Sequence, residues 1–165
     1  MKMVIVSDAT PIISFLKMNR LDILQKLFGE VLLPEAVYGE ITSNEAFSQE
    51  AEQVRNCPFL KRVGVGNREA VDILMRAAGL DLGESEAIVF SDENHADILI
   101  VDEVRARHVA TAMKLRITGT IGILIAANEK GLLDKTEAMK CAEILRASQR
   151  HVSETLFKTL AEHLK

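Results

Sequence analysis

The chain has few of the residues that mark a secreted, disulfide-stapled or zinc-cysteine protein. Its 165 residues include only two cysteines and no tryptophan. Cys57 and Cys141 lack the spacing of a metal site and are too few for a disulfide framework, so we expect reduced thiols and a cytoplasmic protein. The first apolar stretch is already interrupted at Asp8, which is neither a signal peptide nor a membrane span.

An excess of positive charge is also missing. The chain has 20 Lys and Arg against 24 Asp and Glu, a formal net charge of -4. This balance gives no global attraction to nucleic acid or to an anionic membrane, so any nucleic-acid contact must be local. The length is that of one ordinary globular domain, which buries roughly two-thirds of its unfolded surface.

Strands and helices alternate along most of the chain. Strands are expected at 3–7, 30–33, 60–65, 98–101 and 116–118. A first helix, with Thr10 as N-cap and Pro11 at its first position, is followed by helices over 21–28, 34–42, 44–56, 68–78, 82–94, 103–115 and 120–128. This alternation predicts an α/β fold, a three-layer α/β/α sandwich with a mostly parallel central sheet.

Two further helices are expected at the end of the chain, over 135–147 and 153–163, with no strand between them. We therefore expect a main domain over residues 1–133. Residues 134–165 are expected to form a helical C-terminal extension packed on the same domain.

Two of the apolar strands end in an aspartate, Asp8 and Asp102. Strands buried on both faces of a parallel sheet bind ligands outside their carboxyl ends, so both acids should lie at one edge of the sheet. On neighbouring strands the two carboxylates would repel each other, and a cation would relieve that repulsion. Asp102 has an equally good structural explanation as the N-cap of the helix that follows it.

Three glutamates are further candidates for the same edge. Glu40 lies near the C-terminal end of its predicted helix, where a negative charge opposes the helix dipole. A surface ion pair is its alternative explanation. Glu84 and Glu86 open another helix about 200° apart, so only one can face a site while the other caps the helix. Periodicity does not decide between these two.

Together, these residues resemble the PIN-domain nucleases, and especially their VapC-like toxin branch. The resemblance covers roughly residues 2–133. It depends on four positions, each of which matches an acid of the family motif: a strand-end Asp followed two residues on by Thr or Ser, a Glu in the helix after the second strand, an acid before small apolar residues, and a final strand-end Asp. In this chain they are Asp8, Glu40, Glu86 and Asp102. Many relatives have Asp where this chain has Glu86.

The resemblance implies an endoribonuclease that cleaves single strands with Mg²⁺ or Mn²⁺, the toxin of a type II toxin-antitoxin pair. Asp8, Glu86 and Asp102 would bind the metal, and Glu40 would hold or deprotonate a water. Thr10 would donate a hydrogen bond to a ligating carboxylate, with Glu84 close by.

Basic and glycine-rich segments after the Asp102 strand are candidates for contacts with RNA phosphates. They comprise Arg105, Arg107, Lys114, Gly119 and Thr120. A toxin also implies a small antitoxin protein that supplies Arg or Lys to the acids. The apolar stretches 21–28 and 121–127 could form a homodimer face, although they could equally belong to the core.

Other functions fit the sequence less well. A PIN-fold module that binds RNA or a partner without cleavage remains the main alternative. Haloacid-dehalogenase-like phosphatases need a second Asp two residues after the first, where this chain has Thr10. Phospho-receiver domains need an acidic pair, whereas Ser7 precedes Asp8. The chain has no Gly-x-Ser-x-Gly motif, and its four histidines show no ligand spacing.

Overall fold

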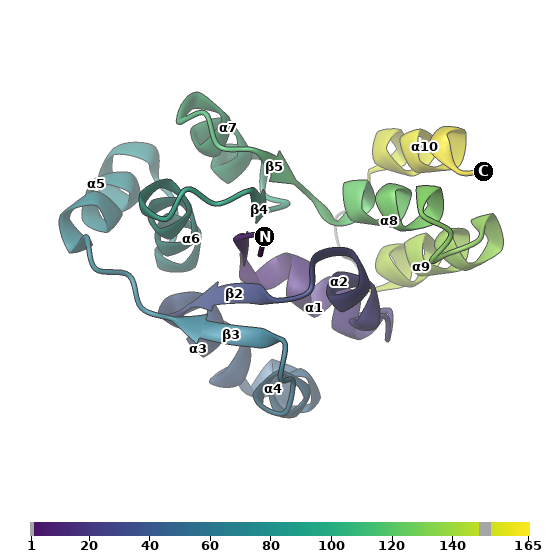
Figure 1. Cartoon of the computed structure of the whole chain (residues 1–165), viewed down its shortest axis with the longest axis horizontal. Helices are drawn as coiled ribbons and strands as arrows, with labels where there is room; N and C mark the ends of the chain where they lie inside the picture. Colours follow the sequence, from purple (N-terminus) through teal and green to yellow (C-terminus); the bar gives the residue numbers. More distant parts are fainter. Residues whose placement is uncertain (1, 149–152) are drawn as a thin grey trace.

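The protein is built on one parallel β-sheet, seen in a computed structural model that describes residues 2–148 and 153–165 (Figure 1). The sheet has five strands in the order β3-β2-β1-β4-β5, and every pairing is parallel. The strands are β1 (Ile5–Ser7), β2 (Val31–Pro34), β3 (Leu60–Val63), β4 (Ile98–Ile100) and β5 (Ile117–Thr118). The predicted α/β/α sandwich with a parallel sheet is confirmed.

Helices connect and flank the strands. They are α1 (Ala9–Lys17), α2 (Asp22–Phe28), α3 (Glu35–Thr42), the 3₁₀ turn η1 (Glu45–Phe47), α4 (Ser48–Arg55), α5 (Arg68–Ala78), α6 (Leu82–Glu93), α7 (Val104–Ala112), α8 (Thr120–Glu129), α9 (Lys135–Ala147) and α10 (Glu154–His163). The predicted boundaries of α5 and α9 are confirmed to the residue. The helix expected over 44–56 is instead divided into η1 and α4.

The chain reverses its direction across the sheet at β1. The first three strands proceed from β1 to β3 on one side, and β4 and β5 then form on the other side. Ser7 pairs with Ile100, and the amide of Asp8 donates to the carbonyl of Ile100 at 3.0 Å. The strands that precede Asp8 and Asp102 are therefore neighbours. Their carboxyl ends form the kind of switch point at which open α/β sheets bind ligands.

The predicted start of α1 is wrong. Thr10 was expected to cap this helix, but α1 begins at Ala9 and Asp8 occupies the N-cap position. The Asp8 side chain nevertheless makes no capping hydrogen bond. Asp8 thus has an extended backbone that ends β1, and its carboxylate is left for another role.

The last two helices lie beside α8 at the end of the molecule opposite α5 (Figure 1). α9 packs against α1 and α8, and α10 packs against α8. The apolar residues of 21–28 and 121–127 are mainly core residues, among them Ile23, Leu24, Ile123 and Leu124. No helix in the described parts of the chain has the length and apolar character needed to cross a membrane.

Candidate active site

Asp8 is a carboxylic acid buried at the centre of the sheet edge. The residue is 5% exposed, and burial is the main reason why its pKa rises to about 8. The amide of Ala9 lowers this pKa in part, whereas the negative charges of Glu40, Asp81 and Glu84 raise it. At neutral pH the group therefore holds a proton that an ordinary aspartate would have lost.

Glu40 and Asp8 converge on Gly83, the second residue of α6. A Cβ atom added at Gly83 would lie 3.1 Å from Oε1 of Glu40 and 3.7 Å from Oδ1 of Asp8. The residue Glu40 as a whole is exposed, but its carboxylate end lies in this partly buried place. Burial is accordingly the main cause of the raised pKa of Glu40, followed by the charges of Asp81 and Glu84.

Glu84 is the third carboxylate of this group. It belongs to a capping box at the start of α6, in which its Oε1 accepts from the Asp81 amide at 3.0 Å while its own amide donates to Asp81 Oδ1 at 2.8 Å. Burial is the main cause of its raised pKa; the Asp81 amide lowers it, and the charges of Asp81 and Glu103 raise it. Glu84 therefore both caps α6 and adds charge to the site.

Asp8, Glu40 and Glu84 are not balanced by a cation among the described residues. Within residues 2–148 and 153–165, no Lys or Arg forms an ion pair with any of the three. We call them the acid cluster. Acids placed next to like charges have raised pKa values, and this arrangement costs stability. Such groups are therefore typical of functional sites.

Glu86 is turned to other partners. It is 3% exposed, its Oε1 accepts from the amide of Ala36 at 2.9 Å, and its Oε2 lies 2.7 Å from Nη1 of Arg68. It is not among the charges that raise the pKa of Asp8. Of the two glutamates that the sequence left open, Glu84 is the one whose charge raises the pKa of Asp8.

Asp102 holds the beginning of α8. Its Oδ1 accepts from the amide of Thr120 at 2.7 Å, and its Oδ2 accepts from the Thr120 hydroxyl at 2.6 Å. The N-cap residue of α8 is Gly119, which has no side chain to do this. The alternative interpretation of Asp102 as the cap of the following helix is wrong, because Glu103 caps α7 through the amide of Ala106.

The predicted phosphate-binding residues are separated by the fold. Arg107 donates to the carbonyl of Val101 at 2.8 Å and thus lies beside the β4 end. Lys114 comes after α7, a helix of nine residues that is roughly 13 Å long. Because α7 leads from the end of β4 back to the start of β5, Lys114 lies toward the amino edge of the sheet. Gly119 and Thr120 are buried, and the Thr120 amide is already bonded to Asp102.

Arg105 and Thr10 have weaker links to the site. Nη1 of Arg105 reaches the carbonyl of Gly79 at 3.5 Å from an exposed position. Thr10, expected to orient a carboxylate, makes no hydrogen bond through its hydroxyl with any described residue, whereas Thr120 does hold Asp102. The part played by Thr120 as a partner of Asp102 was missed in the sequence, since nothing there links positions 102 and 120.

The acid cluster has the right chemistry for Mg²⁺ or Mn²⁺, which take carboxylate oxygens and retain waters. Gly83 leaves room between the carboxylates of Asp8 and Glu40, and the surplus negative charge favours a cation. In the arrangement described for residues 2–148 and 153–165, no three His, Cys, Asp or Glu side chains already form a metal-binding group. The residues fit a metal in donor type and charge.

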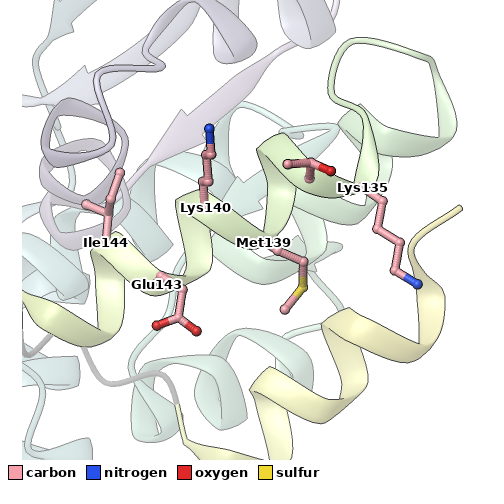
Figure 2. Close-up of a pocket in the computed structure, with 6 residues that line it drawn as sticks. Lys135, Met139, Lys140, Glu143 and Ile144 are labelled. Atoms are coloured by element: carbon pink, nitrogen blue, oxygen red, sulfur yellow. The ribbon is translucent and has the colours of Figure 1, made fainter.

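A surface pocket on α9 is a separate feature (Figure 2). None of the predicted site residues contributes to it. Its lining is formed by Lys135, Thr136, Met139, Lys140, Glu143 and Ile144.

Comparison with known proteins agrees with the parallel α/β fold. A family model described as a PIN domain matches residues 4–165, which is nearly the whole chain. No curated protein and no solved structure matches the chain significantly. PIN domains are generally nucleases. The parallel sheet with acids at its switch point and the match over residues 4–165 lead to one conclusion: this chain belongs to the PIN domain family.

Proposed function

We propose that the protein is a nuclease that uses Mg²⁺ or Mn²⁺ to cleave single-stranded RNA. The observation that carries this proposal is the acid cluster, which combines raised pKa values with the absence of a paired cation in the described chain. A structural role alone would favour balancing these charges, because an unpaired buried carboxylate is costly.

The chain's own residues would divide the work at the edge of the sheet. Asp8 and Glu84 would bind the cation, and Asp102, held by Thr120, would face it from the neighbouring strand. Each carboxylate oxygen has more than one lone pair, so the bonds from Thr120 leave Asp102 able to accept again. Glu40, on the open side, would orient the attacking water and accept its proton.

A bound cation would lower the pKa of the attacking water and offset the charge of the phosphodiester. In the hydrolysis, the water oxygen bonds to phosphorus while the bond from phosphorus to the 3′ oxygen breaks. The leaving oxygen takes up a proton, so the products carry a 3′-hydroxyl and a 5′-phosphate. Asp8 must lose its own proton to bind a cation, and metal binding should therefore release protons at neutral pH.

The test compares cleavage of a mixed single-stranded RNA with that of DNA of the same sequence, with Mn²⁺ or with EDTA. We expect RNA cleavage that needs Mn²⁺ and falls at least 100-fold in Asp8→Asn. The matched control is Asp134→Asn, which changes an exposed capping aspartate and should cleave like the wild type. Equal cleavage by Asp8→Asn would reject the proposed site, and Mn²⁺ binding without cleavage would favour an RNA-binding or partner-binding module.

The toxin role is a further part of the proposal. An antitoxin that inserts Arg or Lys into the acid cluster would supply the cation that the described chain does not. Induced expression of the wild type should arrest bacterial growth, and Asp8→Asn should not. Growth arrest by both the wild type and Asp8→Asn would mean that toxicity does not depend on the acid cluster.

A further inference from the structure

Helix α3 begins without a cap of its own. Its N-cap residue is Pro34, which offers no side-chain acceptor, although the first amides of any helix need one. The amide of Ala36, in the first turn, donates instead to Glu86 Oε1 at 2.9 Å. The acceptor for α3 thus comes from α6, fifty positions further along the chain.

Both oxygens of Glu86 are engaged by this arrangement. While Oε1 accepts from Ala36, Oε2 is paired with Arg68 at 2.7 Å. The Glu86 side chain is 4% exposed, whereas that of Arg68 is 55% exposed. A carboxylate this buried is tolerated when a charged donor and an amide both compensate it. Glu86 is therefore oriented toward α3 and the start of α5.

Glu40 lies one turn beyond the first turn of α3 that Glu86 holds. Ala36 and Glu40 are four residues apart, so they lie one turn apart on the same face of α3. That face meets α6, where Glu40 Oε1 would lie 3.1 Å from a Cβ atom at Gly83. A displacement of the first turn of α3 would move Glu40 relative to Gly83.

We propose that Glu86 and Arg68 form a clamp that positions Glu40, and that Glu86 is not itself a metal ligand. The clamp is a feature of the fold, and its effect on catalysis rests on the proposed function. Glu86 acts through α3, so it is a positioning residue. A glutamine at this position could still accept from Ala36 and would preserve much of the clamp.

The clamp is tested by amide hydrogen exchange at Ala36 together with Mn²⁺ titration by calorimetry. Glu86→Ala should speed exchange at Ala36 at least tenfold and weaken Mn²⁺ binding severalfold. Glu86→Gln should keep both quantities within about threefold of the wild type. Glu84→Gln is the matched control on the same helix, and it should weaken Mn²⁺ binding at least tenfold without changing exchange at Ala36.

Two results would overturn the clamp. One is a tenfold loss of Mn²⁺ affinity in Glu86→Gln with unchanged exchange at Ala36, which would make Glu86 a ligand. The other is unchanged exchange in Glu86→Ala. If that variant does not fold, Arg68→Gln takes its place, and wild-type exchange at Ala36 in it overturns the clamp. A wild-type protein that binds no Mn²⁺ would reject the proposed function, and the exchange data would still decide on the clamp.

Discussion

The same capping box opens two helices of this protein in two different surroundings. Asp81 and Glu84 begin α6, and Asp134 and Glu137 begin α9. In each box the aspartate accepts at 2.8 Å from the amide of the glutamate three residues later, and the glutamate accepts from the aspartate amide in return. The local structure of the two helix starts is therefore the same.

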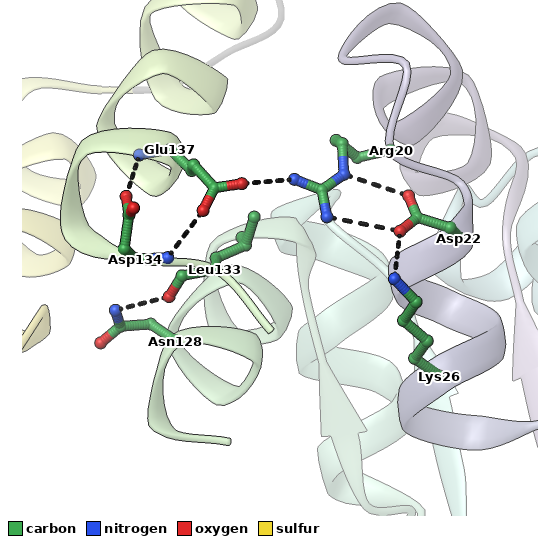
Figure 3. Close-up of polar contacts among 7 residues, drawn as sticks. All are labelled: Arg20, Asp22, Lys26, Asn128, Leu133, Asp134 and Glu137. Carbon is green, nitrogen blue, oxygen red and sulfur yellow. Dashed lines mark hydrogen bonds and ion pairs between the residues drawn. The ribbon is translucent and has the colours of Figure 1, made fainter. Parts of the chain in front are cut away.

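The α9 box is balanced by charge (Figure 3). Oε2 of Glu137 lies 3.2 Å from Nη1 of Arg20, and Arg20 also pairs with Asp22, which in turn pairs with Lys26. Because these acids are paired with Arg20 and Lys26, they need no metal ion to balance their charge. This box ties α9 to the turn before α2.

The α6 box has no such cation in the described residues, and its neighbours are acids. Burial and the charges around Glu84 raise its pKa, and Glu84 in turn contributes to the raised pKa of Asp8. The third residue also differs, because Gly83 in α6 corresponds to Thr136 in α9. A motif that caps a helix thus becomes part of a candidate active site through its surroundings.

The largest expected effect comes from Asp8→Asn in metal-free protein. The folded state holds the Asp8 proton up to a pH of about 8, whereas the unfolded state releases it near pH 3.8. Stability from this group therefore falls as pH rises between these values. Asp8→Asn has no carboxyl group to ionise and does not lose this stability. Its free energy of unfolding relative to wild type should therefore rise by on the order of 4 kcal/mol between pH 5 and pH 8.

Urea unfolding at the two pH values measures this difference. Asp134→Asn, in the balanced box, is the control and should show no such gain. A constant difference between wild type and Asp8→Asn across the range would mean that Asp8 has an ordinary pKa.

The next effect separates the two boxes directly. Glu84→Gln and Glu137→Gln each keep an oxygen that can cap the helix and remove one negative charge. Glu84→Gln should weaken Mn²⁺ binding about tenfold or more, since a charged ligand is lost, a cost of about 1.4 kcal/mol per factor of ten. Calorimetry should show no change for Glu137→Gln, and equal losses in both would locate the metal elsewhere.

A smaller effect is expected when the third position of each box is changed. In Gly83→Ala the added Cβ would lie 3.1 Å from Glu40 Oε1, so the end of this side chain must shift. We expect Mn²⁺ affinity to fall a few fold while the melting temperature stays close to wild type. Thr136→Ala, the corresponding change in α9, should leave affinity unaltered. Unchanged Mn²⁺ affinity in Gly83→Ala would show that metal binding does not depend on the position of the Glu40 carboxylate.

The smallest effect should follow removal of the cation from the balanced box. Arg20→Gln leaves Glu137 without its cation and Asp22 with Lys26 alone, but both acids are well exposed to water. Exposed ion pairs contribute little, so we expect a loss of stability of about 1 kcal/mol or less. Mn²⁺ affinity should not change. A loss of Mn²⁺ binding would mean that α9 is coupled to the acid cluster.

Much of the fold could be predicted from the sequence because local signals determine it. Apolar runs predicted the strands, and the glycine after Ala78 marked the end of α5, where Gly79 adopts a positive φ of 67°. The sequence also predicted that Asp8 and Asp102 end buried strands. Their position on neighbouring strands required the strand order, which the structure supplied.

The contacts of the acids could not be predicted because their partners are distant in sequence. Asp102 bonds to Thr120 and Glu86 to Ala36, and no periodicity relates these positions. The choice between Glu84 and Glu86 depended on such contacts. The expectation that one glutamate caps the helix while the other faces a site is wrong, because Glu84 caps α6 and its charge also raises the pKa of Asp8.

The central position of β1 has a consequence for synthesis of the protein on the ribosome. Because β1 lies between β2 and β4, one of its edges stays unpaired until residues 98–100 have been made. Pairings this distant in sequence form slowly, and domains fold as the chain emerges. Asp8 and Asp102 therefore come together only after about two-thirds of the chain exists, so a nascent chain shorter than this cannot yet assemble the site.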